Sequence, residues 1–357
     1  MRFKLKPLPL PKGVDLETRE VLRQLARANR HLAELKGAAA TIPNENILID
    51  TLALQEAKDS SAIENIVTTA DELYQADAAS DVYTSNASKE VHHYAQALRT
   101  GFERVRKNGV IRLNDILAVQ QILEPQRPGL RKVPGTVLRN AQTGDVIYEP
   151  PQSAVEVADL MDNFVTHLNR DEPGDADPLI RMAVLHYQFE SIHPFYDGNG
   201  RTGRILNLLH LVLHGLLDLP VLYLSRYIVR NKPDYYSGLQ AVRDKEAWES
   251  WVMYILRAVE ETARDTLERV SGIRKLMRDA KQKMRSELPK IYSQDLLNNL
   301  FRHPYTKIEF IERDLDVSRP TAIRYLDELV RIQLVHKTKL GRTNYYINEP
   351  LFKLLSR

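Results

Sequence analysis

A twelve-residue stretch that begins at His193 and reads HPFYDGNGRTGR brings together residue types that handle phosphate chemistry. His193 is a side chain that titrates near neutral pH, and Asp197 offers the hard oxygen ligands that Mg²⁺ prefers. The turn Gly198–Gly200 can direct backbone N–H groups at an anion. Arg201 and Arg204 are three residues apart, so in a helix they share a face and can both donate to phosphate oxygens. The spacing predicts a phosphate site.

The residues after this turn read ILNLLHLVLHGLL, an apolar run rich in strong helix formers. The turn is therefore predicted to open a helix, whose unpaired N–H groups and dipole favour a bound phosphate. The alternative is a plain connector between two helices with a structural histidine beside it. That alternative leaves the metal ligand and the two arginines without a role.

The same stretch resembles the signature loop of Fic-domain proteins, whose fixed residues follow the order His, any, Phe, any, Asp or Glu, Gly-Asn-Gly-Arg, two of any, Arg. The fixed positions are all met by His193, Phe195, Asp197, Gly198, Asn199, Gly200, Arg201 and Arg204. The resemblance implies a mainly α-helical Fic core. It also implies transfer of the AMP moiety of ATP onto a Ser, Thr or Tyr hydroxyl of a target protein, or of the chain itself.

The loop residues are expected to take distinct parts in such a transfer. His193 is the expected general base, because an ordinary pKa of about 6.5 leaves it largely neutral at pH 7. Asp197 is expected to hold Mg²⁺ between the α- and β-phosphates, with Arg201 and Arg204 on the β- and γ-phosphates. The predicted nucleotide site is completed by the amides and small side chains of Gly198, Asn199, Gly200, Thr202 and Gly203.

Helices must hold this loop, and periodic apolar residues predict where they lie. A first helix is predicted from Leu16 to Leu35 with Gly37 closing it, and a second from Pro43-Asn44 to about Asn65. The polar residues 76–88 are expected to form a loose segment. Further helices are predicted over 91–105, 113–123, 155–168 and 179–192, the last of which delivers the histidine of the loop.

The second helix ends in SSAIEN, where Ser60 and Glu64 are four residues apart and share a face. The pattern is common enough to arise by chance. In one subclass of Fic proteins, however, a helix with this pattern is placed before the core, reaches over the loop and inhibits it. By that resemblance Glu64 pairs with Arg204 and occupies the place of the ATP γ-phosphate, with Ser60 beside it as a second regulatory residue.

The segment from Pro125 to Pro151 has the turn residues of a β-hairpin. In Fic proteins a hairpin at this position, the flap, holds the target's backbone as an added strand. The resemblance makes Val146, Ile147 and Tyr148 target-binding residues, and the alternative is a connecting hairpin.

Two tyrosines, Tyr235 and Tyr236, resemble the family's paired aromatics that line the adenine pocket. Some relatives place an Asn seven residues after the second of them, where this chain has Arg243, which puts that contact in doubt.

The C-terminal part differs in charge from the rest. The chain carries a net charge of +3. From Ser271 onward there are 18 Lys and Arg against 10 Asp and Glu, and before it 32 against 37. A predicted helix, turn, helix and two strands resemble a winged-helix module, with Ser318 capping a helix over 319–332. DNA and protein partners are equally compatible with it, and the predicted DNA contacts are Arg319, Thr321, Arg324, Lys337, Lys339 and Arg342.

Length and composition fit a globular protein with more than one unit, since the chain has 357 residues, of which 43% are hydrophobic. There are no cysteines, which excludes disulfides and thiolate sites and fits a cytoplasmic protein. The start, MRFKLKPLPLPKG, lacks the apolar core of a signal peptide. The apolar run 205–224 is interrupted by polar residues, so we expect no membrane span. The expected units are an N-terminal module (1–88, with the inhibitory helix at about 44–65), a Fic core (89–270), and a linker helix with winged helix (271–357).

These features predict an autoinhibited protein adenylyltransferase that uses ATP and Mg²⁺, and a homodimer is possible. Two rival hypotheses remain open at this point. One is a DNA-binding regulator whose Fic core senses a nucleotide without turning it over. The other is an enzyme that works in reverse, with Glu64 positioning water to remove AMP.

Overall fold

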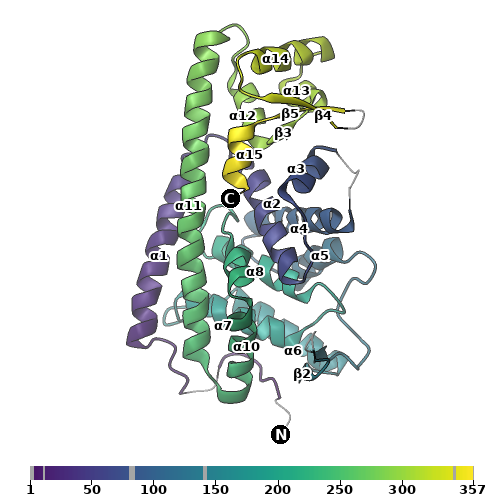
Figure 1. The fold of residues 1–357 in the computed structure, drawn as a ribbon. Coiled ribbons are helices and arrows are strands. Elements are labelled where there is room, and N and C mark those ends of the chain that lie inside the picture. Colours follow the sequence, from purple (N-terminus) through teal and green to yellow (C-terminus); the bar gives the residue numbers. More distant parts are fainter. Residues whose placement is uncertain (1–3, 11–12, 80–84, 140–142, 341–342, 357) are drawn as a thin grey trace.

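The computed structural model describes residues 4–10, 13–79, 85–139, 143–340 and 343–356. Within these ranges the chain forms fifteen helices and two small antiparallel sheets, so the prediction of a mainly α fold is confirmed. Figure 1 shows one long helix along one side, the helical core beside its first half and a smaller unit beside its far end. No helix in the described ranges has the length and apolarity of a membrane span.

The N-terminal helices begin at side-chain caps that the sequence makes recognisable. Thr18 accepts a hydrogen bond from the N–H of Val21 at the start of α1 (Arg19–Ala39). The helix runs on past Gly37, which the sequence had suggested as its end. Asn44 caps α2 (Glu45–Ile63) through the N–H of Asn46. A third helix, α3 (Ala70–Ala79), begins before and extends into the segment expected to be loose.

Helix α2 ends where Asn65 takes a left-handed conformation, with φ of 65°. Asn tolerates this conformation better than most residues with a side chain. The residue before it, Glu64, therefore becomes the C-cap of α2. Its side chain leaves the helix at the end that points toward the core.

The core is built from seven helices, two of which flank the Gly-rich loop. α7 delivers the loop and α8 follows it, and both are largely buried. The bounds are α4 (Asn86–Asn108), α5 (Leu113–Leu123), α6 (Ala154–Leu168), α7 (Pro178–Ile192), α8 (Asn199–Leu213), α9 (Leu224–Arg230) and α10 (Lys232–Lys245).

A small hairpin lies between α5 and α6. Strand β1 (Leu138–Arg139) pairs antiparallel with β2 (Val146–Tyr148), with Leu138 opposite Tyr148 and an irregularity in the register after it. Between the strands, residues 140–142 lie outside the described residues, and Thr143 to Asp145 lead into β2.

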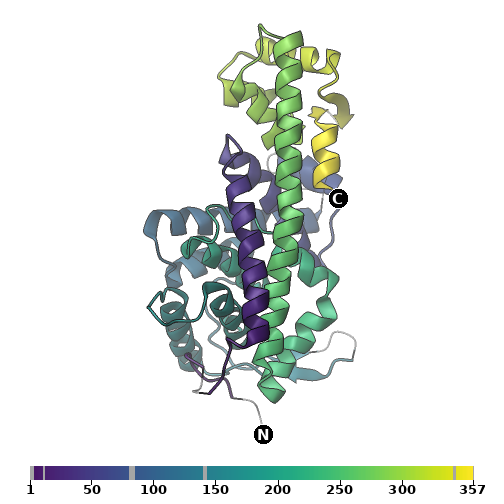
Figure 2. The same ribbon diagram turned by 90° about the vertical axis from the view of Figure 1, so that its left-hand side faces the viewer.

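Helix α11 (Trp248–Glu287) joins the core to the C-terminal unit as one continuous helix. Figure 2 shows α1 lying along its first half and the C-terminal unit beside its second half. The domain boundaries predicted at residues 88 and 270 fall inside α4 and α11. The C-terminal unit contains α12 (Gln294–Arg302), β3 (Tyr305–Thr306), α13 (Ile308–Leu315), α14 (Arg319–Arg331), β4 (His336–Leu340), β5 (Thr343–Ile347) and α15 (Glu349–Leu355). Its strands pair in the order β3-β5-β4.

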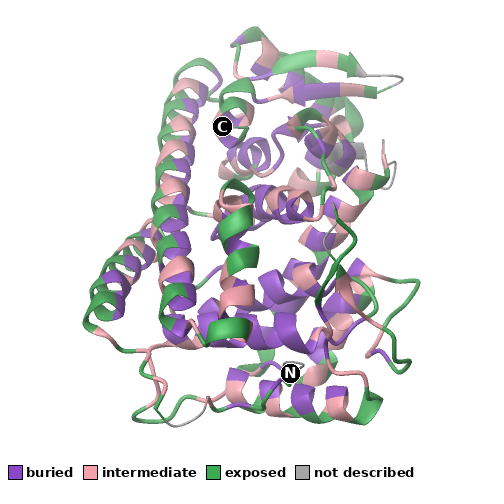
Figure 3. Ribbon diagram, turned by 60° about the horizontal axis from the view of Figure 1, so that its bottom comes forward, coloured by how far each residue is buried: buried purple, intermediate pink, exposed green. Residues whose placement is uncertain are grey.

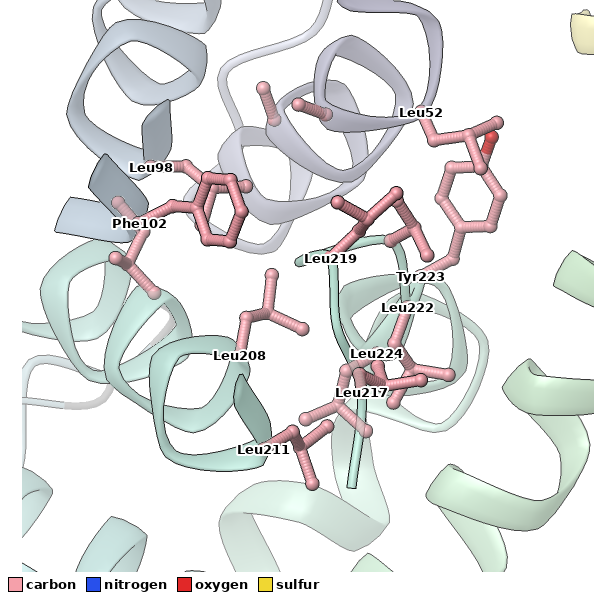
Figure 4. Packing of buried hydrophobic residues seen from close by; sticks show 14 of the residues in the cluster. Leu52, Leu98, Phe102, Leu208, Leu211, Leu217, Leu219, Leu222, Tyr223 and Leu224 are labelled. Carbon is pink, nitrogen blue, oxygen red and sulfur yellow. The ribbon is translucent and has the colours of Figure 1, made fainter. Parts of the chain in front are cut away.

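The inhibitory helix predicted from sequence, α2, packs against these core helices and shares their apolar cluster. Figure 3 shows buried residues continuing through the middle of the molecule, and Figure 4 shows Leu52 of α2 in the same apolar cluster as Leu98 of α4 and Leu208 of α8. The other side of α2 contacts the C-terminal unit. There the carboxylate of Asp50 forms ion pairs with Arg99 of α4 and Arg302 of α12. Helix α2 is therefore held by both units.

Candidate active site

The loop between α7 and α8 is held in one shape by its own backbone and one side chain. His193 caps α7 in the left-handed region, with φ of 48°. Gly198, with φ of 77°, caps the N-terminus of α8 in the same region, where glycine carries no steric penalty. Asn199, the first residue of α8, holds the middle of the loop: its buried side-chain amide accepts from the N–H of Phe195 at 2.8 Å and donates to the Phe195 carbonyl at 2.9 Å.

These contacts change the part expected of some loop residues. The side chain of Asn199 is committed to Phe195, so it shapes the loop and leaves only its backbone N–H for a phosphate. Thr202 is fully buried. Gly203 faces α7, where an added Cβ would lie 2.7 Å from a carboxylate oxygen of Glu190. The first turn of α8 therefore offers an anion its amides more than its side chains.

His193 is part-buried, and its pKa is lowered to about 4. The main cause is withdrawal of the ring from water, and the positive charge of Arg131 acts in the same direction. The imidazole is therefore neutral at physiological pH, as a general base must be, and with a wider margin than its ordinary pKa provides.

Arg204 is bound at the end of α2. Its Nε donates to the hydroxyl of Ser60 at 2.7 Å, and its Nη2 donates to the Ser60 carbonyl at 3.1 Å and to Glu64 Oε1 at 2.8 Å. Only 2% of the arginine side chain is exposed. Burial opposes its charge, but Glu64 and other neighbours raise the pKa of Arg204 overall. The predicted pairing of Glu64 with Arg204 is present.

Arg201 is surrounded by four carboxylates, and 3% of its side chain is exposed. Asp197 Oδ1 of the loop is the most distant, 3.9 Å from Nη2, and the other three belong to three helices. Glu64 Oε2 lies 2.9 Å from its Nε, Glu90 Oε2 of α4 lies 2.8 Å from Nη1, and Glu124 Oε1 at the end of α5 lies 2.6 Å from Nη2. The carboxylate of Glu64 thus bridges both arginines of the loop. Glu90 and Glu124 carry no motif of their own, so nothing in the sequence marks them as site residues.

Gly200 makes this bridge possible. A Cβ at this position would lie 2.8 Å from Glu64 Oε1 and 2.8 Å from Arg204 Nη1, closer than real contacts allow. A side chain at this position would therefore have to move the end of Glu64 or Arg204, and glycine leaves that space to a carboxylate or an anion of similar size.

Asp197 differs from the other acids of the site because 70% of its side chain is exposed. Its Oδ1 accepts from the N–H of Gly198 at 2.7 Å. Among the residues that the structure describes, no three His, Asp or Glu side chains form a metal-binding group. Mg²⁺ at nucleotide sites is bound by one or two carboxylates, substrate phosphates and water, and an accessible carboxylate at the phosphate turn fits that requirement.

The two tyrosines predicted for the adenine pocket face different surroundings. Tyr235 is buried, its hydroxyl lies 2.8 Å from His186 Nε2, and its ring packs against Trp251. Tyr236 is exposed and meets Tyr235 edge to face. Only Tyr236 has a free face for a base. Arg243 lies over the ring of Tyr148 in the hairpin, 4.0 Å from its centroid.

The predicted flap residues lie on β2 and alternate in exposure. Val146 and Ile147 are exposed, while Tyr148 is buried and its hydroxyl donates to the Ser191 carbonyl at 2.8 Å. Arg131, before β1, is also buried and donates to the carbonyl of His193. The hairpin therefore begins and ends beside His193. No motif in the sequence marks Arg131 as a residue of this site.

The residues predicted to contact DNA are far from this site, in the C-terminal unit, and some are paired within it. Arg319 donates to Glu309 at 2.9 Å and to Glu312 at 3.1 Å, and Lys337 donates to Asp327 at 3.3 Å. Thr321 and Arg324 lie on α14 and Lys339 on β4, whereas Arg342 lies outside the described residues. DNA binding remains a prediction.

Comparison with known families agrees with the loop. The protein-family model described as Fic/DOC family matches residues 107–211, and the family model described as Fic/DOC family N-terminal matches residues 22–103. Together they span more than half of the chain. The chain belongs to the Fic/DOC family. Residues 276–351 match the C-terminal domain of SoFic-like protein adenylyltransferases.

Curated relatives of this Fic/DOC family chain are named protein adenylyltransferases. The one from Aedes aegypti is 31% identical over 159 residues, covering 44% of this chain and 30% of its own length. The Caenorhabditis elegans protein adenylyltransferase fic-1 is 30% identical over 128 residues, covering 35% of this chain and 24% of its own. The chain therefore spans about a quarter to a third of the length of these relatives.

Solved structures share the fold. A Fic family protein from Desulfovibrio desulfuricans G20 has a TM-score of 0.57 at 20% identity, covering 96% of this chain and 98% of that one. A Fic domain containing signaling protein from Bacteroides thetaiotaomicron has a TM-score of 0.55 at 18% identity, covering 69% and 97%. The first of these likenesses includes the N-terminal and C-terminal units as well as the core.

Proposed function

We propose that this chain transfers AMP from ATP to a hydroxyl side chain of a target protein, and that Glu64 inhibits the transfer. The observation that carries the proposal is the carboxylate of Glu64 bridging Arg201 and Arg204 at the N-terminus of α8. A helix N-terminus with two buried arginines is a site for a multiply charged anion. Glu64 stands where such an anion would bind, beside a neutral histidine.

The residues of the loop divide the work of the reaction. The acceptor oxygen attacks the α-phosphorus in line with the departing pyrophosphate, and His193 accepts the hydroxyl proton at a ring nitrogen. Arg201 and Arg204 bind the phosphates beyond the α-phosphate, and the amides at the start of α8 bind phosphate oxygens. Asp197 holds Mg²⁺, which when bound offsets the charge of the phosphates. Catalysis is thus mainly orientation and electrostatic stabilisation.

Inhibition follows from a conflict over one position. With Glu64 on Arg204, the γ-phosphate cannot take its place, and the α-phosphorus is displaced from the line of attack. A displacement of about 1 Å can lower the rate about 10²-fold. Replacing Glu64 by Gly removes the carboxylate without filling the space, so AMP transfer should rise by at least that order.

The decisive experiment is incubation of the chain with ATP labelled at the α-phosphate and Mg²⁺, followed by detection of label on protein. Glu64→Gly should raise labelling, and His193→Ala in the Glu64→Gly form should abolish it while ATP affinity stays within a few-fold. Arg204→Ala in the same form should also lose labelling, because the arginine serves the γ-phosphate too. Unchanged labelling after loss of His193 would refute the proposed chemistry.

A second incubation tests the reverse direction. Labelled AMP on protein, once formed by the Glu64→Gly form, is offered to the unchanged chain. Release of AMP that depends on Glu64 would show removal of AMP, with Glu64 as the residue that positions water. Stable label would favour Glu64 as an inhibitor alone.

A further inference from the structure

The residues just before and just after the hairpin are hydrogen-bonded, through Arg131, to the main chain on both sides of His193. The backbone N–H of Arg131 donates to the Pro194 carbonyl at 2.9 Å. Its guanidinium donates to the His193 carbonyl from Nε at 2.8 Å, and from Nη2 to the carbonyls of Ile192 and Pro151. Pro151 follows β2, so one side chain joins both ends of the hairpin to the histidine segment.

Two tyrosines extend this connection. The N–H groups of Lys132 and Val133 donate to the hydroxyl of Tyr196 at 2.9 and 3.1 Å. From the other strand, the hydroxyl of Tyr148 donates to the Ser191 carbonyl at 2.8 Å. The hairpin is thereby bonded to residues 191, 192, 193, 194 and 196.

His193 needs this support because its backbone is in the left-handed region, which side-chain-bearing residues rarely adopt. Such conformations persist where surrounding contacts determine them, and they gather at functional sites. The guanidinium of Arg131 is 2% exposed and bonds the carbonyl of the residue that is in this conformation. This guanidinium donates to three main-chain carbonyls, and no carboxylate is bonded to it in the described part of the chain. Burying a charge without a counter-charge costs free energy, so we expect the contact to serve the position of the main chain.

We propose that Arg131 is a positioning residue for AMP transfer, which holds His193 in its left-handed conformation and fixes the flap to the base. The proposal rests on the function proposed above. Its consequence is that the target-binding strand and the proton acceptor move as one body, so a hydroxyl held at β2 reaches His193 at a set distance.

The charges around the imidazole of His193 make its pKa a test of the role of Arg131, because an arginine that only stabilised the fold would leave this pKa unchanged. The groups that face His193 are Arg131, Arg243 from α10, Glu64 from α2 and the backbone of Glu190 in α7. After burial, Arg131 is the largest cause of the lowered pKa of His193, whereas Glu64 and the Glu190 backbone act against it. Removing the charge at residue 131 should therefore raise this pKa toward its ordinary value of about 6.5.

The test uses the full chain carrying Glu64→Gly, with Arg131→Gln, Arg131→Lys and Tyr148→Phe compared. Arg131→Gln should lower kcat by about 10- to 100-fold, leave the KM for ATP within a few-fold, and move the acid limb of the pH profile upward. Arg131→Lys keeps the charge, so the limb should stay low and part of kcat should return. Tyr148→Phe should lower kcat with the limb unmoved. The matched control is Arg127→Gln, an exposed arginine in the same segment.

A second readout does not need activity. The imidazole C2–H resonance of His193 is assigned with His193→Ala and titrated by NMR in the full chain, with and without Arg131→Gln. An upward shift of its pKa supports the proposal. Loss of kcat with the acid limb and the NMR pKa unmoved would overturn it, since Arg131 would then act on the fold alone. If the NMR shift appears while no variant transfers AMP, the proposed function fails and the coupling of Arg131 to His193 stands.

Discussion

The ion pairs of Glu64 with Arg201 and Arg204 should raise folding stability and lower affinity for ATP, and both quantities can be measured. Glu64→Gly removes a hydrogen bond of 2.8 Å to Arg204 and an ion pair of 2.9 Å to Arg201. Breaking a buried pair by removing one partner costs about 3–5 kcal/mol. The lower end applies, because 27% of Glu64 is exposed and Ser60 still holds Arg204. We expect the free energy of unfolding without nucleotide to fall by about 3 kcal/mol.

The same free energy should reappear in ATP binding with the opposite sign. In the unchanged chain ATP either binds misplaced, without the γ-phosphate contact to Arg204, or displaces Glu64 to gain that contact. Removing Glu64 returns up to about 3 kcal/mol, which corresponds to roughly 100-fold in the dissociation constant. Urea unfolding without nucleotide and calorimetric titration with a non-hydrolysable ATP analogue measure the two quantities. Glu64→Ala separates the loss of the carboxylate from the flexibility of glycine, and AMP, which lacks the γ-phosphate, should gain much less. Unchanged stability together with unchanged ATP affinity would refute this account.

Three further predictions concern titration and packing. Because the pKa of His193 is lowered to about 4, its neutral form persists in acid, so AMP transfer by the Glu64→Gly form should hold from pH 7 to 5 and decline only near pH 4, and an acid limb near 6.5 contradicts this. Burial raises the pKa of Glu56 from 4.5 to about 8, so its stabilising contribution is present below pH 4.5 and is lost as pH rises through about 8. Urea unfolding at pH 5 and at pH 8.5 should therefore show that the free energy of unfolding of Glu56→Gln rises relative to that of the unchanged chain at the higher pH. The same difference between the two chains at both pH values would contradict the raised pKa of Glu56. Asp50→Ala leaves both Arg99 and Arg302 without their carboxylate, whereas Arg302→Ala removes only one of the two ion pairs. In urea unfolding, Arg302→Ala should lower the free energy of unfolding by about 1 kcal/mol and Asp50→Ala by more. Equal losses would show that Asp50 does not stabilise through both arginines.

Local signals in the sequence were sufficient for most of the helices and for the loop. Asn44 and the apolar period located α2. The four-residue spacing put Ser60 and Glu64 on one face, and the resemblance to Fic proteins, not the spacing, put them beside Arg204. Gly37 misled because glycine inside a long packed helix costs only about 1 kcal/mol relative to alanine, which packing of α1 against α11 offsets.

The partners of the loop could not be predicted, because they are distant in the chain and have no pattern. Glu90 and Glu124 are 111 and 77 residues from Arg201, and Arg131 is 62 from His193. Any surface glutamate would look the same in sequence. The two-residue strand β3 was missed for a similar reason, since only its pairing with β5 makes it a strand.

The fixed position of α2 bears on how quickly the site can open. Leaving as a unit would expose its apolar face and break its contacts with both neighbours. The last turn is buried as well, but Glu64 follows it as the C-cap, and 27% of its side chain is exposed. Glu64 can therefore withdraw by a rotamer change of its own side chain while the helix stays in place, on a nanosecond-to-microsecond scale. Relief of inhibition is then a fast pre-equilibrium, in which nucleotide concentration sets the open fraction and no slow activation lag precedes turnover.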